Sequence, residues 1–378
     1  MTTSISKSLK LKWSFLRPKR PQNILDNSLL LYQGRYAFYT ALSLLGIHQD
    51  DEVLMPAFHC LSMVEPIIRF GCRFNFYRVS GDLQATVEDL EAVISNRTRA
   101  VILVHYFGLA QRNLSYLKTY LQLRNVYLIE DCAHIVPMAD VRASETGDVS
   151  IYSPRKFLPL IDGALLRINS GNDEFKQPHI KKLPLLKELK TIKNTFEHHS
   201  GIIDNNQWIR NFYLRIDNAI NSSRKAVMPV RKNADTCPPV IFDMSLINVS
   251  CTWLASYLIE RASFSDIYHK RANNFQYLYH ELCRGYTHCR EPEFLQNRQG
   301  NCVFGFPVIA KNKRVAIHEL KRRGIQTFTF GEELYRHCAE QVDRYLVHEL
   351  FFVPVHQDLT SDDLKFIVEN LKAVLADN

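Results

Sequence analysis

Two separated stretches of the chain carry residue types that could do chemistry together. Lys156 follows the short apolar stretch 149–152 and lies between apolar neighbours. Asp131 ends a second apolar stretch, and His134 follows it three residues later. An amine can form an imine with an aldehyde, and a carboxylate can keep a pyridine nitrogen protonated. The two stretches therefore suit pyridoxal phosphate (PLP).

The elements that would position these residues alternate between strands and helices. Strands separated by helical patterns predict βαβ units and a largely parallel sheet, with ligands beyond the carboxyl ends of the strands. His59, His105, Asp131 and Lys156 each follow a predicted strand, so we expect them to meet in one cleft. The sequence predicts strands at 51–56, 72–79, 100–104, 126–131, 149–152 and 161–169, and helices at 34–45, 58–71, 87–95 (N-cap Thr86) and 114–123.

Length and composition indicate an ordinary globular protein. The chain has 378 residues, of which 46% are hydrophobic and 23% charged, which favours two domains with a large core. The nine cysteines are scattered without a CxxC pair, so we expect neither a disulfide framework nor a metal site, but reduced thiols in a cytoplasmic enzyme. No apolar run reaches the ~18 residues of a membrane-spanning helix.

The formal charge of +8 is partly concentrated at the start of the chain. Residues 1–28 form a predicted basic arm without the apolar core of a signal peptide. We expect this arm to be solvated, or to touch an anionic membrane surface or an acidic partner. Elsewhere the basic residues are dispersed and no stacking platform is visible, which argues against nucleic acid and suits a phosphorylated substrate.

The composition changes after residue 169. Residues 170–233 are polar and rich in Lys and Asn, with a helical pattern whose apolar anchors are Trp208, Phe212 and Leu214. We assign them to a large domain at 29–243, as a helical connection over the sheet edge. A long helix at 244–275 should lead into a small domain at 244–378. That domain would contain strands at 302–309 and 350–355 and helices at 313–324 and 361–376.

The ordered motifs resemble the DegT/DnrJ/EryC1/StrS family of PLP-dependent sugar aminotransferases. They are His-Tyr-Phe-Gly at 105–108, Glu-Asp-Cys-Ala-His at 130–134, Ser-Pro-Arg-Lys-Phe-Leu-Pro at 153–159 and Pro-Val-His at 354–356. The resemblance covers the chain from about Leu29. It implies the α/β, type I PLP-transferase fold: a large domain with a mostly parallel sheet flanked by helices, plus a smaller C-terminal α+β domain. It also implies a homodimer.

The resemblance implies roles for individual residues. Lys156 would form the Schiff base and carry the proton, Asp131 would pair with the pyridine nitrogen, and His134 would lie near the 3-hydroxyl. The phosphate would be held by Ser153 and the backbone of Gly34, Arg35 and Tyr36. His59 or Cys60 would stack on the ring face. The residues implied on the substrate side are His105, Tyr106, Arg155 and His356.

The chain departs from the family pattern around the phosphate. Gly34-Arg35 stands where relatives usually have Gly-Thr or Gly-Ser, so Arg35 either supplies charge in place of a hydroxyl or points elsewhere. Ser153 lies closer to Lys156 than the phosphate serine usually does, and Gly163-Ala164 replaces a double glycine. We therefore expect an atypical phosphate site.

Each candidate residue has a structural alternative. Lys156 could be a surface lysine, Asp131 a helix cap and His134 a hydrogen-bonded core histidine. Arg155 could form an interface salt bridge. Packing alone could explain His105, Tyr106 and His356.

The motifs together predict an aminotransferase that moves an amino group from an amino acid, glutamate being the expected donor, to a keto-sugar. The keto-sugar would be nucleotide-linked and used for a surface glycan. Two alternatives stay open: a PLP-dependent sugar dehydratase, and a non-catalytic family member that acts as a binding partner.

Overall fold

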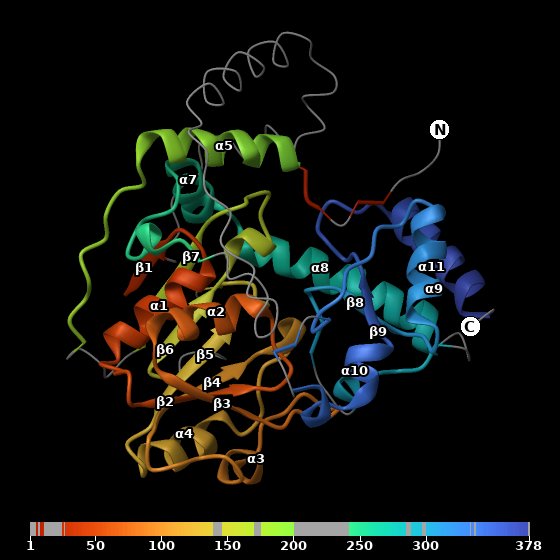
Figure 1. Ribbon diagram of the computed structural model, residues 1–378. Coiled ribbons are helices and arrows are strands. Elements are labelled where there is room, and N and C mark those ends of the chain that lie inside the picture. Colours follow the sequence, from red (N-terminus) through yellow and green to blue (C-terminus); the bar gives the residue numbers. More distant parts are fainter. Residues whose placement is uncertain are drawn as a thin grey trace, which may run out of the picture.

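The computed structural model describes most of the chain in two packed units (Figure 1). Residues 11–24 of the arm and 200–241, which include the anchors Trp208, Phe212 and Leu214, lie outside the described residues. The described residues are 5–6, 8–10, 25, 27–138, 146–169, 175–199, 242–284, 289–296, 300–332, 334–335 and 338–376.

The larger unit is built on a seven-stranded sheet. Only β7 runs against its neighbours, because β2 to β6 pair in parallel and β1 pairs antiparallel to β7. The expected mostly parallel sheet is thus confirmed. The strand order is β1 (Ser28–Leu31), β7 (Ala164–Ile168), β6 (Val149–Tyr152), β5 (Tyr127–Cys132), β4 (Thr98–Val104), β2 (Glu52–Pro56) and β3 (Arg73–Tyr77).

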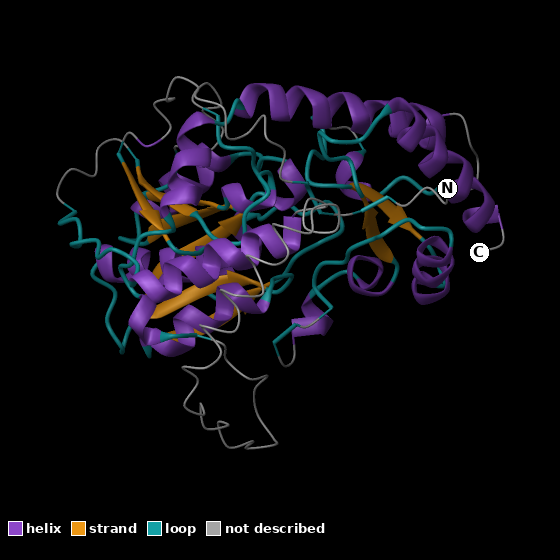
Figure 2. Ribbon diagram, turned by 90° about the horizontal axis from the view of Figure 1, so that it is seen from above, coloured by secondary structure: helices purple, strands orange, loops and turns teal. Residues whose placement is uncertain are grey.

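Helices lie on both sides of this sheet, as Figure 2 shows. This explains why β4 is continuously apolar from Ala100 to Val104, since strands of a covered parallel sheet are buried on both faces. The helices are α1 (Gly34–Leu44), α2 (Leu61–Phe70), α3 (Val87–Glu91), α4 (Leu114–Gln122) and α5 (Leu185–His199).

Local signals set the ends of several helices. Thr86 caps α3 as expected: its hydroxyl accepts from Asp89 N–H, and the Asp89 carboxylate accepts from Thr86 N–H. α3 nevertheless ends at Glu91, four residues before the predicted end. α2 ends at Gly71, whose φ of 88° lies in the left-handed region that glycine tolerates.

The expected long helix at 244–275 is wrong. The structure divides it into η6 (Met244–Leu246), α7 (Trp253–Arg261) and α8 (Phe264–Tyr279), which continues into η7 (His280–Arg284). Thr252 and Ser263 each turn a side chain back to cap the next helix, accepting from Ala255 N–H and Asp266 N–H. Such residues favour caps over helix interiors, and this is why the helix breaks there.

The smaller unit contains a two-stranded antiparallel sheet. Its strands are shorter than predicted, because residues 302–305 turn toward the larger unit before β8 begins. Short 3₁₀ turns also occur at Glu293–Leu295 and Cys338–Gln341. The elements are β8 (Phe306–Ile309), β9 (Leu350–Val353), α9 (Lys313–Arg322), α10 (Arg344–His348) and α11 (Ser361–Ala376).

Aromatic side chains join the two units. The Phe107 ring of the larger unit lies 4.4 Å from the Phe352 ring and 6.2 Å from the Phe304 ring of the smaller one. The start of the chain also packs on the smaller unit, where Ile5 bridges to Ile325. Because Ile5 and Leu9 are buried, the expectation of a solvated arm is wrong for this part of the chain. No described helix has the length and apolarity to cross a bilayer.

Candidate functional site

Lys156 and Asp131 come together at the carboxyl ends of neighbouring strands. Asp131 lies near the end of β5, and Lys156 ends the 3₁₀ turn η5 (Pro154–Lys156) that follows β6. Burial lowers the pKa of Lys156 to about 8, while nearby Cys60 and Asp131 act to raise it. Burial raises the pKa of Asp131, and the Lys156 charge opposes that rise. The two groups therefore share one electrostatic environment, as the spacing predicted.

The Asp131 carboxylate is buried and only partly used by the protein. Its Oδ1 accepts a hydrogen bond from Ala133 N–H at 2.9 Å. No described residue donates to its Oδ2. A buried carboxylate with one oxygen left over fits a charged hydrogen bond to a protonated ring nitrogen.

His134 is held as a neutral donor. Its ring lies between those of Phe107 and Phe304, at centroid distances of 5.5 and 4.1 Å. Its Nδ1 accepts from Phe107 N–H at 3.2 Å, and burial lowers its pKa well below the ordinary value. The proton of the neutral ring therefore sits on Nε2. A donor at this place fits the expected contact with the 3-oxygen of PLP.

The loop that orients His134 is strained. Phe107 has a φ of 58°, which is rare for an aromatic residue. Next to it Gly108 has a φ of 100°, and a Cβ there would lie 2.8 Å from Val303 Cγ2. The structure thus turns the backbone sharply between β4 and α4, which aims Phe107 N–H at His134.

The helix α1 begins beside this group. A Cβ on Gly34 would meet no atom within 4 Å, so space is open at the first turn. The N–H groups of Tyr36 and Ala37 donate to Gln33 O, as in an ordinary first turn. The Tyr36 side chain packs on Phe242 at 4.9 Å, so both its ring and its N–H are engaged within the protein.

The Arg35 guanidinium is held by side chains of α2. It forms an ion pair with Glu65 of α2 at 2.5 Å and lies 3.4 Å from Ser62 Oγ. Of the two readings of Arg35, the structure supports the one in which it points elsewhere.

The Arg155 side chain has a buried N–H group without a described partner. Its buried Nε has no hydrogen-bond partner in the part of the chain that the structure describes. Burial and nearby Arg35 lower its pKa. No described carboxylate lies within ion-pair distance, so the interface salt bridge is not observed. Ser153 is buried beside it and its carbonyl accepts from Lys156 N–H.

A cavity of about 360 Å³ opens in front of Lys156. Its walls come from both units and from the start of the chain, and Lys156 Nζ lies 5.4 Å from the Phe304 ring centre. The described lining includes no aspartate or glutamate, so the cavity favours anions. The ionisable lining residues are Arg155, Lys156, His198, His199, Arg271 and His356.

The structure places His105 and Tyr106 in the core, not toward the cavity. His105 is fully buried, with Nδ1 accepting from Gln111 N–H at 3.1 Å and Nε2–H donating to Glu130 at 2.8 Å. The Tyr106 hydroxyl donates to the carbonyl of Phe58. The expectation that both face the substrate is therefore wrong, and their packing alternative holds.

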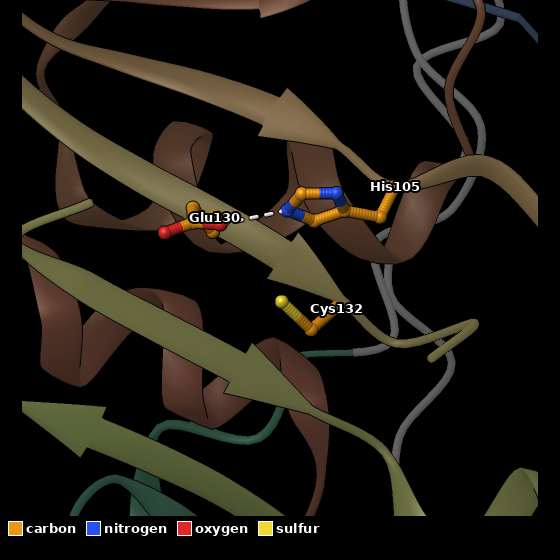
Figure 3. Close-up of side chains that lie close together, drawn as sticks. All are labelled: His105, Glu130 and Cys132. Carbon is orange, nitrogen blue, oxygen red and sulfur yellow. Dashed lines mark hydrogen bonds and ion pairs between the residues drawn. The ribbon is translucent and has the colours of Figure 1, made fainter. Parts of the chain in front are cut away.

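His105, Glu130 and Cys132 bring potential metal-ligating atoms within 4.8 Å of one another (Figure 3). Glu130 accepts from both His105 and Gly147 N–H, which uses both carboxylate oxygens. Because His105 and Glu130 find their hydrogen-bond partners within the protein, we interpret this cluster as structural.

His59 also has other partners than a cofactor ring. Its Nδ1–H donates to Pro56 O at 3.1 Å, its Nε2 accepts from Tyr335 N–H at 3.0 Å, and its ring stacks on Phe76 at 4.9 Å. Cys60 is instead the residue that interacts electrostatically with Lys156 and Asp131. Of the two candidates for the ring face, the geometry favours Cys60.

Two histidines of the cavity wall hold the start of the chain. His356 Nε2–H donates to Ser6 O at 2.8 Å, and its Nδ1 accepts from Asp358 N–H. His199 Nδ1–H donates to Leu9 O at 2.8 Å. His356 thus lines the cavity, but both of its ring nitrogens brace the fold.

Sequence reasoning missed Arg271. It occupies a buried position of α8 between Ile267 and Phe275, at a spacing of four residues. An arginine at the apolar positions of an amphipathic helix was the signal that could have found it.

Comparison with known proteins identifies the likeness. The model of the DegT/DnrJ/EryC1/StrS aminotransferase family matches residues 27–182. GDP-perosamine synthase of Vibrio cholerae is 37% identical over 123 residues, which are 32% of this chain and 33% of that protein. UDP-N-acetyl-3-dehydro-alpha-D-glucosamine 3-aminotransferase of Acidithiobacillus ferrooxidans is 33% identical over 27% of this chain and 28% of that protein. The match spans about a third of the length of these relatives.

Solved structures show the same fold over almost the whole chain. PseC of Helicobacter pylori, an aminotransferase of pseudoaminic acid biosynthesis, has a TM-score of 0.66 at 12% identity. The superposition covers 100% of this chain and 100% of PseC. The aminotransferase TlmJ of Streptoalloteichus hindustanus has a TM-score of 0.64 at 16% identity, with 99% of this chain and 100% of that chain covered. The expected α/β fold is confirmed, and so is the family resemblance over the matched residues.

Proposed function

We propose that this chain, whose residues 27–182 match the aminotransferase family, is a PLP-dependent aminotransferase that passes an amino group from an amino acid to a keto-sugar. The observation that carries the proposal is the shared environment of Lys156 and Asp131 at adjacent strand ends, beside a cavity without acidic lining. This is the arrangement that PLP chemistry needs.

The residues present fit the cofactor at each of its polar ends. Asp131 would hold the ring nitrogen, His134 Nε2–H would donate to the 3-oxygen, and Lys156 would hold the aldehyde carbon. The orphaned Nε of Arg155 and the open space at Gly34 suit the phosphate, next to Ser153. When bound, PLP supplies an aldehyde that captures amines and a ring that withdraws electrons.

Lys156 is suited to move the proton between donor and product carbon atoms. With a pKa of about 8 its amine gains and loses a proton at little cost near neutral pH. The Phe304 ring beneath Nζ stabilises the charged form, and Asp131 does so over a longer range. The Lys156 charge favours the ionised form of Asp131, which would hold positive charge on the ring nitrogen when PLP is bound.

The expected substrates are an amino donor such as glutamate and a nucleotide-linked keto-sugar for a surface glycan. The relatives named for GDP- and UDP-linked sugars support this class. The free thiols of the eight described cysteines support a reducing, cytoplasmic location.

A homodimer is part of the proposal. Apolar side chains are exposed on and beside α5 and α7, which lie together in Figure 1: Leu185 (69%), Leu186 (73%), Trp253 (60%) and Met244 (50%). Exposed apolar groups gathered on one face suit a second copy. Light scattering should give twice the chain mass, and Leu186→Asp should lower it.

The decisive test is the visible absorbance of the purified protein with PLP. Wild type should show the band of a lysine-linked cofactor, Lys156→Ala should lose it, and the exposed Lys365→Ala should keep it. Mass spectrometry with glutamate and candidate keto-sugars then detects the amino sugar. A wild type that never takes up PLP would contradict the proposal. Uptake without any amine transfer would favour the sugar dehydratase instead.

A further inference from the structure

Arg271 is a buried cation with neutral partners. It lies on α8 with 3% of its surface exposed. Its Nε–H donates to Gln357 Oε1 at 2.8 Å and its Nη1 donates to Val303 O at 3.0 Å. No described carboxylate reaches ion-pair distance. Burial lowers the pKa of Arg271 to about 9, and the more distant Asp358 opposes that shift only in part. A buried charge with only neutral acceptors is costly unless an anion joins it, which points to a ligand.

The remaining guanidinium N–H groups are available to that ligand. A guanidinium has five N–H groups in a planar fork, and the two hydrogen bonds above use one on Nε and one on Nη1, which leaves the second N–H of Nη1 and both of Nη2. The other N–H groups have no acceptor in the described chain, and Arg271 forms part of the cavity wall. Gln357 and the Phe157 ring at 4.9 Å fix the plane of the guanidinium, so its remaining N–H groups are preorganised for a ligand.

Arg271 and Lys156 are held by the same two segments of the chain. Arg271 packs on Phe157, the residue after Lys156, and donates to Val303 O. Lys156 in turn lies over Phe304, the residue after Val303. Gln357 ties the arrangement together, since its Nε2 donates to Phe157 O at 2.8 Å. One ligand in this cavity can therefore contact both cations.

The size of the cavity decides which anion fits. At about 360 Å³ it is near the lower end of the roughly 300–1,000 Å³ of small-molecule sites. That space suits an amino acid better than a nucleotide-linked sugar. A carboxylate also matches the planar fork with two parallel hydrogen bonds.

We propose that Arg271 binds a carboxylate of the amino donor and thereby selects the donor for the reaction at Lys156. This inference rests on the proposed aminotransferase function. Arg271 is a substrate-binding residue in this proposal, distinct from Arg155, which we assign to the cofactor phosphate.

The test compares R271Q and R271K with wild type and with the exposed control R322Q, all loaded with PLP. The loss of visible absorbance is followed after mixing with L-glutamate, over a range of concentrations. We expect R271Q to raise the half-saturating glutamate concentration about 100-fold and R271K about tenfold, because a hydrogen bond to a charged group contributes about 1.5–3 kcal/mol. Binding of GDP and UDP should stay unchanged.

Each other result is informative. Equal half-saturation in wild type and R271Q would overturn the inference. A loss confined to GDP or UDP binding would also overturn it, since the anion would then be a phosphate. If R271Q does not fold, R271K decides by the same criterion. A wild type that takes up no PLP, or reacts with no amino acid, would instead overturn the proposed function.

Discussion

Glu130 and Asp131 are adjacent on β5, yet they belong to two opposite kinds of polar site. Successive side chains of a strand point to opposite faces, so one carboxylate turns toward His105 and the other toward Lys156. Glu130 is fully buried and accepts from His105 (Figure 3). Its other oxygen accepts from Gly147 N–H. Asp131 keeps one oxygen without a described donor and interacts with the charge of Lys156, which lines the cavity.

Whether a buried polar cluster satisfies its own hydrogen bonds distinguishes structural from functional clusters in this fold. The cluster of His105, Glu130 and Gly147 satisfies its own hydrogen bonds, so it stabilises the chain and needs no ligand. The cluster of Asp131, Lys156 and Arg155 has charges and N–H groups left over. Leaving these groups unpaired costs free energy in the free protein, and a bound ligand that pairs with them removes that cost.

The largest effect should come from Asp131→Asn. The substitution keeps the shape but removes the charge that would hold the ring nitrogen protonated. We expect turnover to fall by roughly 10²–10⁴-fold, the range for loss of one electrostatic catalytic group, while PLP is still bound. Steady-state kinetics and the absorbance spectrum measure this. The exposed Asp362→Asn is the control, and near-normal turnover of Asp131→Asn would break the comparison.

Glu130→Gln should have the opposite signature. It removes a charged acceptor from His105 and Gly147, so we expect the free energy of unfolding to fall by about 1–3 kcal/mol. PLP uptake and the pH profile of turnover should not change. Urea unfolding of this variant beside exposed Glu369→Gln measures the loss. A changed pH profile with normal stability would show that Glu130 belongs to the functional site.

Arg155→Gln tests the phosphate end of the site. We expect PLP affinity to fall about 10- to 100-fold, because a charged hydrogen-bond donor is lost. Affinity for pyridoxal, which lacks the phosphate, should be the same in wild type and variant. Titrations of the apoenzyme with both compounds measure the two affinities. If the affinities for PLP and for pyridoxal fall equally, Arg155 does not bind the phosphate.

The smallest effect concerns pH. Lys156 must lose its proton before it attacks the PLP aldehyde, so uptake should speed up as pH rises through its pKa of about 8. From pH 7 to 8 the neutral fraction grows about fivefold, and above pH 8 it levels off. For an ordinary lysine, with a pKa of ~10.4, the neutral fraction would rise about tenfold per pH unit over this range. Stopped-flow absorbance distinguishes the two curves.

Strands in the large unit were predictable because a buried strand appears in the sequence as a run of consecutive apolar residues. The spans 149–152 and 361–376 were predicted to the residue, and Thr86 was recognised as a cap. The helix at 244–275 was not, because the capping side chains of Thr252 and Ser263 compete with an otherwise apolar helical pattern.

The side chains that follow strands were harder to assign. His59, His105 and Lys156 occupy equivalent places in the sequence pattern, yet only Lys156 faces the cavity. The loop after β4 turns sharply at Phe107, and that turn buries His105 and Tyr106. A strained backbone of this kind leaves no local signature in the residue types.

The sequence alone predicted six of the seven strands of the large sheet, all but β1, and the approach of Asp131 to Lys156. Periodicity and strand ends are local properties, and parallel strands bring their carboxyl ends to one edge. Only the tertiary structure decided that Arg35 turns to Glu65, that Ile5 and Leu9 are buried, and that Arg271 reaches the cavity. These outcomes depend on contacts between residues far apart in the chain, because burial and charge compensation are set by whatever segment packs alongside.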